Sequence, residues 1–186
     1  MTSNGFVATK EEMFEISRGD RSRVKLVVVQ SSNESKAVVT ALLYPFVPLT
    51  DDELRASSQR FGPAIVAFCA QRIGTRVGNG ECWTLADEAI KACDADPVMG
   101  LNFGQEIDPS DVAPGDILQF DSCRFDLPWG GFKTAGLPQH TAVVVGRGPE
   151  GIRVLEQNPG PVAEGSYDLS QLVSGTMKAW RVVPKR

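Results

Sequence analysis

Two hydrophobic patterns follow one another along this chain, and their order is the strongest constraint on its fold. Between residues 50 and 94 the apolar residues recur every three or four positions, as they do on the buried face of a helix. From residue 115 to the C-terminus they form short runs rich in β-branched residues, separated by glycine and proline, as in strands. Helices followed by consecutive strands predict an α+β domain with an antiparallel sheet.

Capping and turn residues place the expected elements of this domain. Thr50-Asp-Asp-Glu53 has the sequence of a capping box, which predicts a helix from there to Ile73, with Gly62-Pro63 as the point where it would break. A second helix is predicted from Cys82 to about Asp94. Strands are predicted at residues 115–120, 140–145, 152–158 and 177–183, and a long loop at residues 122–139.

The N-terminal part of the chain has a different pattern. Val24–Gln30 and Lys36–Tyr44 are rich in β-branched residues, and the turn-forming sequence Ser-Ser-Asn-Glu-Ser at residues 31–35 separates them, so they predict a β-hairpin. We therefore divide the chain into an N-terminal β-hairpin extension, residues 1–50, and an α+β domain, residues 51–186.

The composition excludes several classes of protein. The 186 residues, 42% of them hydrophobic, are enough for one good core. The net charge of −4 argues against a nucleic-acid partner, since phosphate binding needs a basic face. No run approaches the roughly 20 apolar residues of a membrane span, and residues 1–16 lack the apolar segment of a signal peptide. Four cysteines without paired spacing and a single histidine make no zinc motif. We expect a cytoplasmic protein without metal or cofactor that does not bind membranes.

Cys82 stands at the start of the second predicted helix, behind Val77-Gly-Asn-Gly80, and two interpretations fit it. In the first, the glycines make a turn and Cys82 packs inside as a small apolar residue. In the second, the glycines leave room for a substrate and for backbone N–H groups to approach an oxyanion, while the helix N-terminus lowers the pKa of the thiol. Glu81 opposes the second interpretation, because a neighbouring carboxylate disfavours another negative charge.

A cysteine nucleophile needs a base, and His140 is the sole histidine of the chain. Glu156 and Asn158 lie two residues apart on the following strand and so point to the same face. A hairpin closed around residue 148 places His140 opposite Glu156, and one closed around residue 149 places it opposite Asn158. Either register brings an oxygen acceptor to the imidazole, although a polar residue ending a strand also explains His140 taken alone.

Four motifs together resemble the CHAP and NlpC-P60 group of papain-like cysteine amidases and peptidases. They occur in the order of that group over roughly residues 60–183, and they are Gly80-Glu-Cys82, Pro114-Gly-Asp-Ile-Leu-Gln-Phe120, Gln139-His-Thr-Ala-Val-Val-Val145 and Leu155-Glu-Gln-Asn158. The stretch Gly78-Asn-Gly-Glu-Cys-Trp-Thr-Leu-Ala86 is also similar to papain-like domains of intracellular eukaryotic proteins, including one at the C-terminus of fungal cortical actin-patch proteins.

The resemblance implies a papain-like fold in which Cys82 is the nucleophile and His140 the general base. Glu156 and Asn158 match the family positions that orient the histidine and complete the site. Asp116 matches a Gly-Asp turn, which we take as structural.

Two departures from the family pattern bear on the chemistry. Many CHAP proteins carry a glutamine before the cysteine, where this chain has Glu81, which donates a hydrogen bond only when protonated. Some CHAP proteins bind calcium through aspartates in the preceding loop. The corresponding Arg76-Val-Gly-Asn-Gly80 has no carboxylate, so we expect no calcium there.

Substrate contacts are expected from Gly80, Glu81 and Trp83 beside the nucleophile, and from Trp129 and Phe132 in the long loop. The alternatives are that Trp83 anchors its helix and that the loop is an Ω-loop packing its own aromatics. The expected function is hydrolysis of a peptide or peptidoglycan-like amide through a cysteine acyl-enzyme. A catalytically weak domain that binds a protein partner and an acyltransferase using the same residues are the alternatives.

Overall fold

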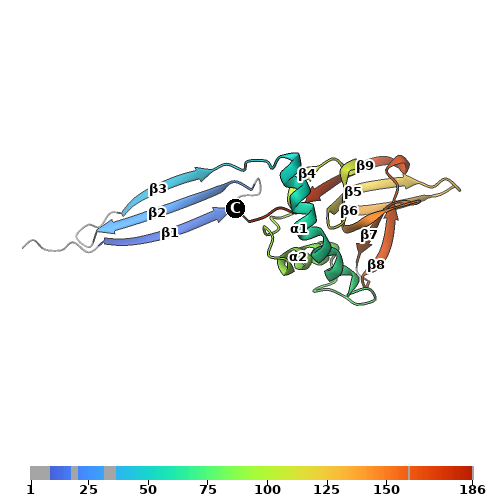
Figure 1. Ribbon diagram of the computed structural model, residues 1–186, viewed down its shortest axis with the longest axis horizontal. Coiled ribbons are helices and arrows are strands. Elements are labelled where there is room, and N and C mark those ends of the chain that lie inside the picture. The colour runs from blue at the N-terminus through green and yellow to red at the C-terminus, as the bar shows by residue number, and fades with distance from the viewer. Residues whose placement is uncertain (1–8, 18–20, 32–36, 159, 186) are drawn as a thin grey trace, which may run out of the picture. The chain divides into compact units, whose positions relative to one another are not determined.

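The computed structural model describes residues 9–17, 21–31, 37–158 and 160–185, shown as coloured ribbon in Figure 1. By the contacts within it, the chain divides between Pro48 and Leu49 into two compact units. Of the predicted turn at residues 31–35, only residue 31 lies within the described residues.

The N-terminal unit contains a three-stranded antiparallel sheet in which the predicted hairpin forms two strands. Its strands, in sheet order, are β1 (Thr9–Ser17), β2 (Arg23–Ser31) and β3 (Ala37–Tyr44). Val27 of β2 lies opposite Thr40 of β3 on one side and Met13 of β1 on the other. The sequence did not predict β1, because its lysine and glutamates are depleted in strands and its pattern does not alternate.

The second unit is built from two helices and a six-stranded sheet, which confirms the α+β class. Its helices are α1 (Asp51–Ala70) and α2 (Cys82–Ala92), and its short 3₁₀ turns are η1 (Pro109–Asp111) and η2 (Leu169–Gln171). Its strands are β4 (Gln105–Ile107), β5 (Ile117–Asp126), β6 (Phe132–Gly148), β7 (Gly151–Glu156), β8 (Ala163–Tyr167) and β9 (Leu172–Arg181). All neighbours are antiparallel, in the order β4-β9-β5-β6-β7-β8.

Along the central strands, successive apolar side chains point to opposite faces of the sheet, so both faces are covered by apolar residues. On one face, Val143 and Leu155 pack with Ile65 of α1 and Ile90 of α2. Figure 1 shows the two helices lying together beside the sheet. On the other face, a second cluster contains Phe120, Phe125, Ala142, Val144, Val154 and Tyr167. Because both faces are covered by apolar side chains, the sequences of the central strands are near-continuous runs of hydrophobic residues.

Helix α1 begins as predicted but does not break at Gly62-Pro63. The Thr50 side chain accepts a hydrogen bond from the Glu53 amide, and the Glu53 carboxylate accepts one from the Thr50 amide at 2.7 Å, which completes the capping box. The helix continues through Pro63 to Ala70. A proline inside a helix costs about 3 kcal/mol, and burial of the apolar stripe of α1 offsets this cost.

The prediction of a long loop at residues 122–139 is wrong, because most of this segment is a β-hairpin. β5 and β6 remain paired from Cys123–Ala135 out to Asp126–Phe132, beyond a bulge that follows Asp121. Residues 127–131 make the turn, where Gly130 and Gly131 adopt positive φ. The glycines and prolines of the segment suggested a loop, while its alternating buried residues are those of a strand.

Candidate active site

Cys82 is the first residue of α2, and the glycine loop before it determines how the thiol is placed. Glu81 is the N-cap, with φ −69° and ψ 145°. Gly78 and Gly80 adopt φ of +56° and +89°, in the left-handed region that favours glycine. Cys82 is only 8% exposed. The cysteine therefore sits at a helix N-terminus, as the sequence predicted, with its thiol largely shielded from solvent.

Three side chains from three different elements meet at the candidate site. The Cys82 thiol lies close enough to the imidazole of His140, in the middle of β6, for the histidine to lower the pKa of the thiol. Nε2 of His140 lies 2.7 Å from Oε2 of Glu156, the last residue of β7, which leaves Nδ1 of the ring for the thiol. The His140 and Glu156 side chains are 12% and 19% exposed. This geometry suits a nucleophile, a proton-transfer group and an orienting carboxylate.

Tyr167, at the end of β8, also holds Glu156, a contact that no motif in the sequence indicated. Its hydroxyl donates a hydrogen bond to the same Oε2 at 2.9 Å. Its ring lies 4.3 Å from that of Phe120, which in turn stacks on His140 with ring centroids 5.9 Å apart. Burial first, and then Glu156, raise the pKa of Tyr167, so the phenol remains a donor at neutral pH. Tyr167 thus fixes the carboxylate that orients the histidine.

Gln157, which was not predicted as a site residue although both of its neighbours were, connects β7 to the glycine loop. The side chain is 2% exposed. Its Nε2 donates to the carbonyls of Val77 at 2.9 Å and Glu81 at 3.0 Å, and its Oε1 accepts from the Val77 amide at 3.0 Å. Because these groups flank the loop that ends at Cys82, Gln157 fixes the nucleophile relative to the strand that carries Glu156. The signal available in the sequence was a glutamine between two candidate site residues.

The electrostatics of the site favour a thiolate–imidazolium pair. Burial raises the pKa of Cys82, but the hydrogen bond and charge of His140, with the amides of Thr141 and Trp83, outweigh it and lower the pKa below its ordinary value. Burial lowers the pKa of His140, but the hydrogen bonds and charges of Cys82 and Glu156 outweigh it and raise the pKa to about 9. At neutral pH the histidine is therefore protonated beside a cysteine that ionises readily.

Comparisons with known proteins assign the chain to a family. Residues 39–186 match the family described as the AIM3/BBC1 cysteine proteinase-fold domain. The chain belongs to this family. It is also 31% identical to Altered inheritance of mitochondria protein 3 of Debaryomyces hansenii, in an alignment that covers 73% of the chain and 17% of that relative. The chain thus spans about a sixth of the relative's length. No solved structure matches it.

The family match refines the expected resemblance. It supports a cysteine proteinase fold and starts within β3, before the roughly residue 60 at which the motif resemblance began. It agrees with the similarity to papain-like domains of eukaryotic proteins, whereas membership of the CHAP or NlpC-P60 groups is not part of it.

In this AIM3/BBC1-family domain, Asn158 does not join the hydrogen-bond chain. Val143 pairs with Leu155, and this register, if continued, would set Asn158 opposite His140. However, β7 ends at Glu156, Asn158 is exposed, and no hydrogen bond between the described residues joins it to His140. The carboxylate reaches the imidazole instead, so the part assigned to Asn158 remains a prediction.

The residues expected to contact substrate lie in two places. Gly80 is buried in the loop before Cys82, Glu81 is exposed and makes no capping bond to α2, and Trp83 is 40% exposed on the first turn. Trp129 and Phe132, 80% and 58% exposed, are at the tip of the β5–β6 hairpin. Their contacts with a substrate remain predictions.

The cysteines of the family domain differ sharply in ionisation, and all of them lie in described residues. Burial raises the pKa of Cys69 to about 12 and raises those of Cys93 and Cys123. Cys82 alone has a lowered pKa. Among the described residues, no three side chains are grouped so that they could hold a metal ion. None of the helices described is both long enough and apolar enough to cross a membrane.

Gly165→Ala is expected to displace the Glu156 carboxylate and lower the pKa of His140. A Cβ at Gly165 would lie 2.4 Å from Oε1 of Glu156, while the backbone there is not in the left-handed region. With its carboxylate displaced, the His140 midpoint should fall from about 9 to below about 8. Because the chain has one histidine, an NMR titration of its ring protons reports this directly. Gly160→Ala is the matched control, since no atom lies within 4 Å of a Cβ there. An unchanged midpoint in Gly165→Ala would contradict the prediction.

Proposed function

We propose that this domain is a thiol-dependent amide hydrolase that works through a Cys82 acyl-enzyme. The observation that carries the proposal is the grouping of Cys82, His140 and Glu156: Nε2 of His140 lies 2.7 Å from Oε2 of Glu156, and His140 lowers the pKa of the Cys82 thiol while its own pKa is raised. The family's cysteine proteinase fold supports it. The chemistry is the one implied by the CHAP and NlpC-P60 resemblance.

The proposed reaction begins with attack of the Cys82 thiolate on the carbonyl carbon of an amide. Backbone N–H groups at the start of α2 stabilise the negative charge on the carbonyl oxygen. His140, as imidazolium, gives its proton to the leaving nitrogen as the C–N bond breaks, and a thioester remains on Cys82. Glu156 holds the ring in position through this step.

Deacylation reverses the role of the histidine. Neutral His140 takes a proton from a water molecule, whose oxygen attacks the thioester carbon. The C–S bond then breaks, the acid product leaves, and Cys82 returns to thiolate beside protonated His140. His140 is therefore an acid in the first step and a base in the second, which modifies the general-base role expected from the sequence.

The proposed substrate is a peptide or isopeptide amide of a cytoplasmic protein. The relative is a yeast protein, so a protein amide is a closer fit than the peptidoglycan-like amide that the CHAP resemblance also allows. No cofactor enters the proposed steps, because the nucleophile, the acid–base group and its orienting carboxylate are all side chains of this chain.

Trapping with peptidyl vinyl methyl esters tests the proposal, because these electrophiles react with an activated thiolate. We expect intact-mass and peptide-mapping analysis to find one adduct, on Cys82, formed at least about 100-fold more slowly in His140→Ala. Peptide libraries then identify the amide that is cleaved, with Cys82→Ser as the inactive control. Equal labelling of Cys82 and Cys93, or labelling unaffected by loss of His140, would refute the proposal.

Two alternatives use the same domain differently. A binding module for a protein partner is favoured by apolar side chains exposed on β3 of the N-terminal unit, among them Val38, Val39 and Leu43. It predicts partner binding that survives Cys82→Ser.

An acyltransferase would share the acyl-enzyme and deliver the acyl group to an added amine in preference to water, which product analysis detects.

A further inference from the structure

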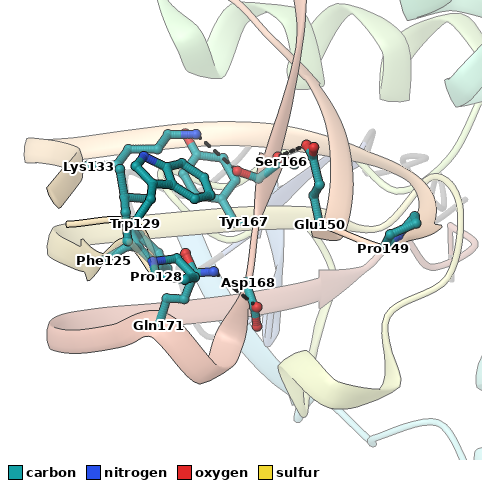
Figure 2. A pocket seen from close by; sticks show the side chains of 11 residues that line it. Phe125, Pro128, Trp129, Lys133, Pro149, Glu150, Ser166, Tyr167, Asp168 and Gln171 are labelled. Atoms are coloured by element: carbon teal, nitrogen blue, oxygen red, sulfur yellow. Dashed lines mark hydrogen bonds between the residues drawn. The ribbon is translucent and has the colours of Figure 1, made fainter. Parts of the chain in front are cut away.

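A pocket of about 400 Å³ opens between the tip of the β5–β6 hairpin and β8, and Cys82 is not part of its lining. In the sheet, β7 lies between β6 and β8, yet Nζ of Lys133 on β6 donates to the Ser166 carbonyl of β8 at 3.0 Å. This contact indicates that the sheet bends here. Figure 2 shows Trp129 and Lys133 along one side and Glu150 across from them. The volume lies in the range of small-ligand and side-chain pockets.

The aromatic lining of this pocket includes one ring, that of Trp129, that is largely exposed to solvent. Trp129 is 80% exposed, which is unusual for a large apolar ring with no substrate or partner to cover it. Tyr167 also lines the pocket, but its ring is already covered by Lys133, whose Nζ lies 3.6 Å from the ring centroid. Trp129 is therefore the ring that remains open to a ligand.

The charges of the lining favour a cation. The pocket contains two carboxylates, Glu150 and Asp168, and one ammonium group, Lys133. Lys133 is engaged by the Ser166 carbonyl and the Tyr167 ring, and burial lowers its pKa despite the opposite effect of Glu156. Neither pocket carboxylate forms a salt bridge with a cation of the described residues. An anionic ligand would meet two like charges here, while a cationic ligand would meet two unlike charges.

Glu150 is the carboxylate best able to bind an incoming cation. Asp168 accepts hydrogen bonds from the Ser170 amide, the Ser170 hydroxyl and the Gln171 side chain, so its oxygens are occupied. Glu150 is exposed, and the Ser166 hydroxyl donates to it over a long distance of 3.5 Å. A planar cation on Trp129 would have this carboxylate available on the other side of the pocket (Figure 2).

We propose that this pocket binds the arginine side chain of a polypeptide, with the guanidinium stacked on Trp129 and paired with Glu150. Arginine suits the site better than lysine because its guanidinium is planar, stacks on aromatic faces and binds carboxylates through two N–H groups. The proposal does not depend on the chemistry proposed for Cys82. The pocket adjoins that site through Tyr167, whose ring lines the pocket while its hydroxyl holds Glu156.

The test is an NMR titration of the Cys82→Ser protein, in which hydrolysis cannot contribute. The probes are N-acetyl-arginine amide and its neutral isostere N-acetyl-citrulline amide. The chain has three tryptophans, so Trp129→Phe assigns the indole N–H signal of Trp129. We expect the arginine probe to shift this signal saturably and to bind about fivefold more tightly than the citrulline probe.

Glu150→Gln should remove most of that preference. Glu164→Gln is its matched control, since it removes an equal charge from β8 beside the pocket without belonging to the pocket lining. The proposal is overturned if the arginine probe does not shift the Trp129 signal or if both probes bind equally. It is also overturned if Glu150→Gln keeps the preference while Glu164→Gln loses it.

Discussion

Replacing His140 by alanine is expected to slow the alkylation of Cys82 by iodoacetamide at pH 7 by roughly tenfold or more. His140 lowers the pKa of Cys82 by its hydrogen bond and charge, whereas burial acts in the opposite direction. Without the imidazole only the burial effect and the backbone amides remain, so the pKa rises and less thiolate is present at neutral pH. The rate–pH profile should shift to higher pH, with the largest loss below the new midpoint. Mass spectrometry of peptides containing each cysteine measures these rates.

Two comparisons make this measurement specific. Gln139→Ala changes the exposed residue next to His140 and should leave the Cys82 profile unchanged. Cys69 and Cys93, whose pKa values are raised by burial, serve as internal references for unfolding, because both would react faster if the domain opened. If Cys82 reacts equally slowly with and without His140, the thiolate–imidazolium pair does not form in solution.

Gln157→Leu is expected to destabilise the domain by about 3 kcal/mol and to make the position of the Cys82 thiol less well defined. Leucine fills similar space but leaves the Val77 amide and the carbonyls of Val77 and Glu81 without their buried partner. For a domain of this size the loss corresponds to a Tm lower by about 6–12 °C. Because the same bonds fix the loop before Cys82, the folded variant should also show slower alkylation of Cys82 well below its Tm. Circular dichroism and the alkylation assay measure the two effects.

A second variant distinguishes positioning by Gln157 from a general contribution to stability. Gln157→Glu keeps an acceptor for the Val77 amide but cannot donate to the two carbonyls while it is ionised. It should slow Cys82 alkylation even where it is fully folded. The exposed Gln139→Leu is the control for the leucine variant. A Gln157→Leu protein with an unchanged Tm and unchanged Cys82 reactivity would show that the loop is held by other contacts.

Local sequence was sufficient for most of the helices and for the core strands. The capping box at Thr50 and the apolar stripe after Cys82 gave both helices within a few residues of their ends. It failed where tertiary contacts outweigh local preference, at Pro63 inside α1 and in the hairpin that was expected to be a loop. β8 was not predicted either, because its sequence Ala-Glu-Gly-Ser-Tyr has little strand propensity. The strand is held in place by pairing with β7.

By itself the sequence determined the α+β class and identified the candidate site residues. They are a cysteine at the start of a helix, one histidine, and a carboxylate two strand positions from an amide. These are properties of neighbouring residues, which periodicity and capping encode directly. Only the tertiary structure showed that Glu156 contacts His140, that Tyr167 donates a hydrogen bond to Glu156, and that Gln157 holds the loop before Cys82. Such contacts depend on strand register, on where β7 ends and on how the sheet bends, and these follow from packing between segments far apart in the chain.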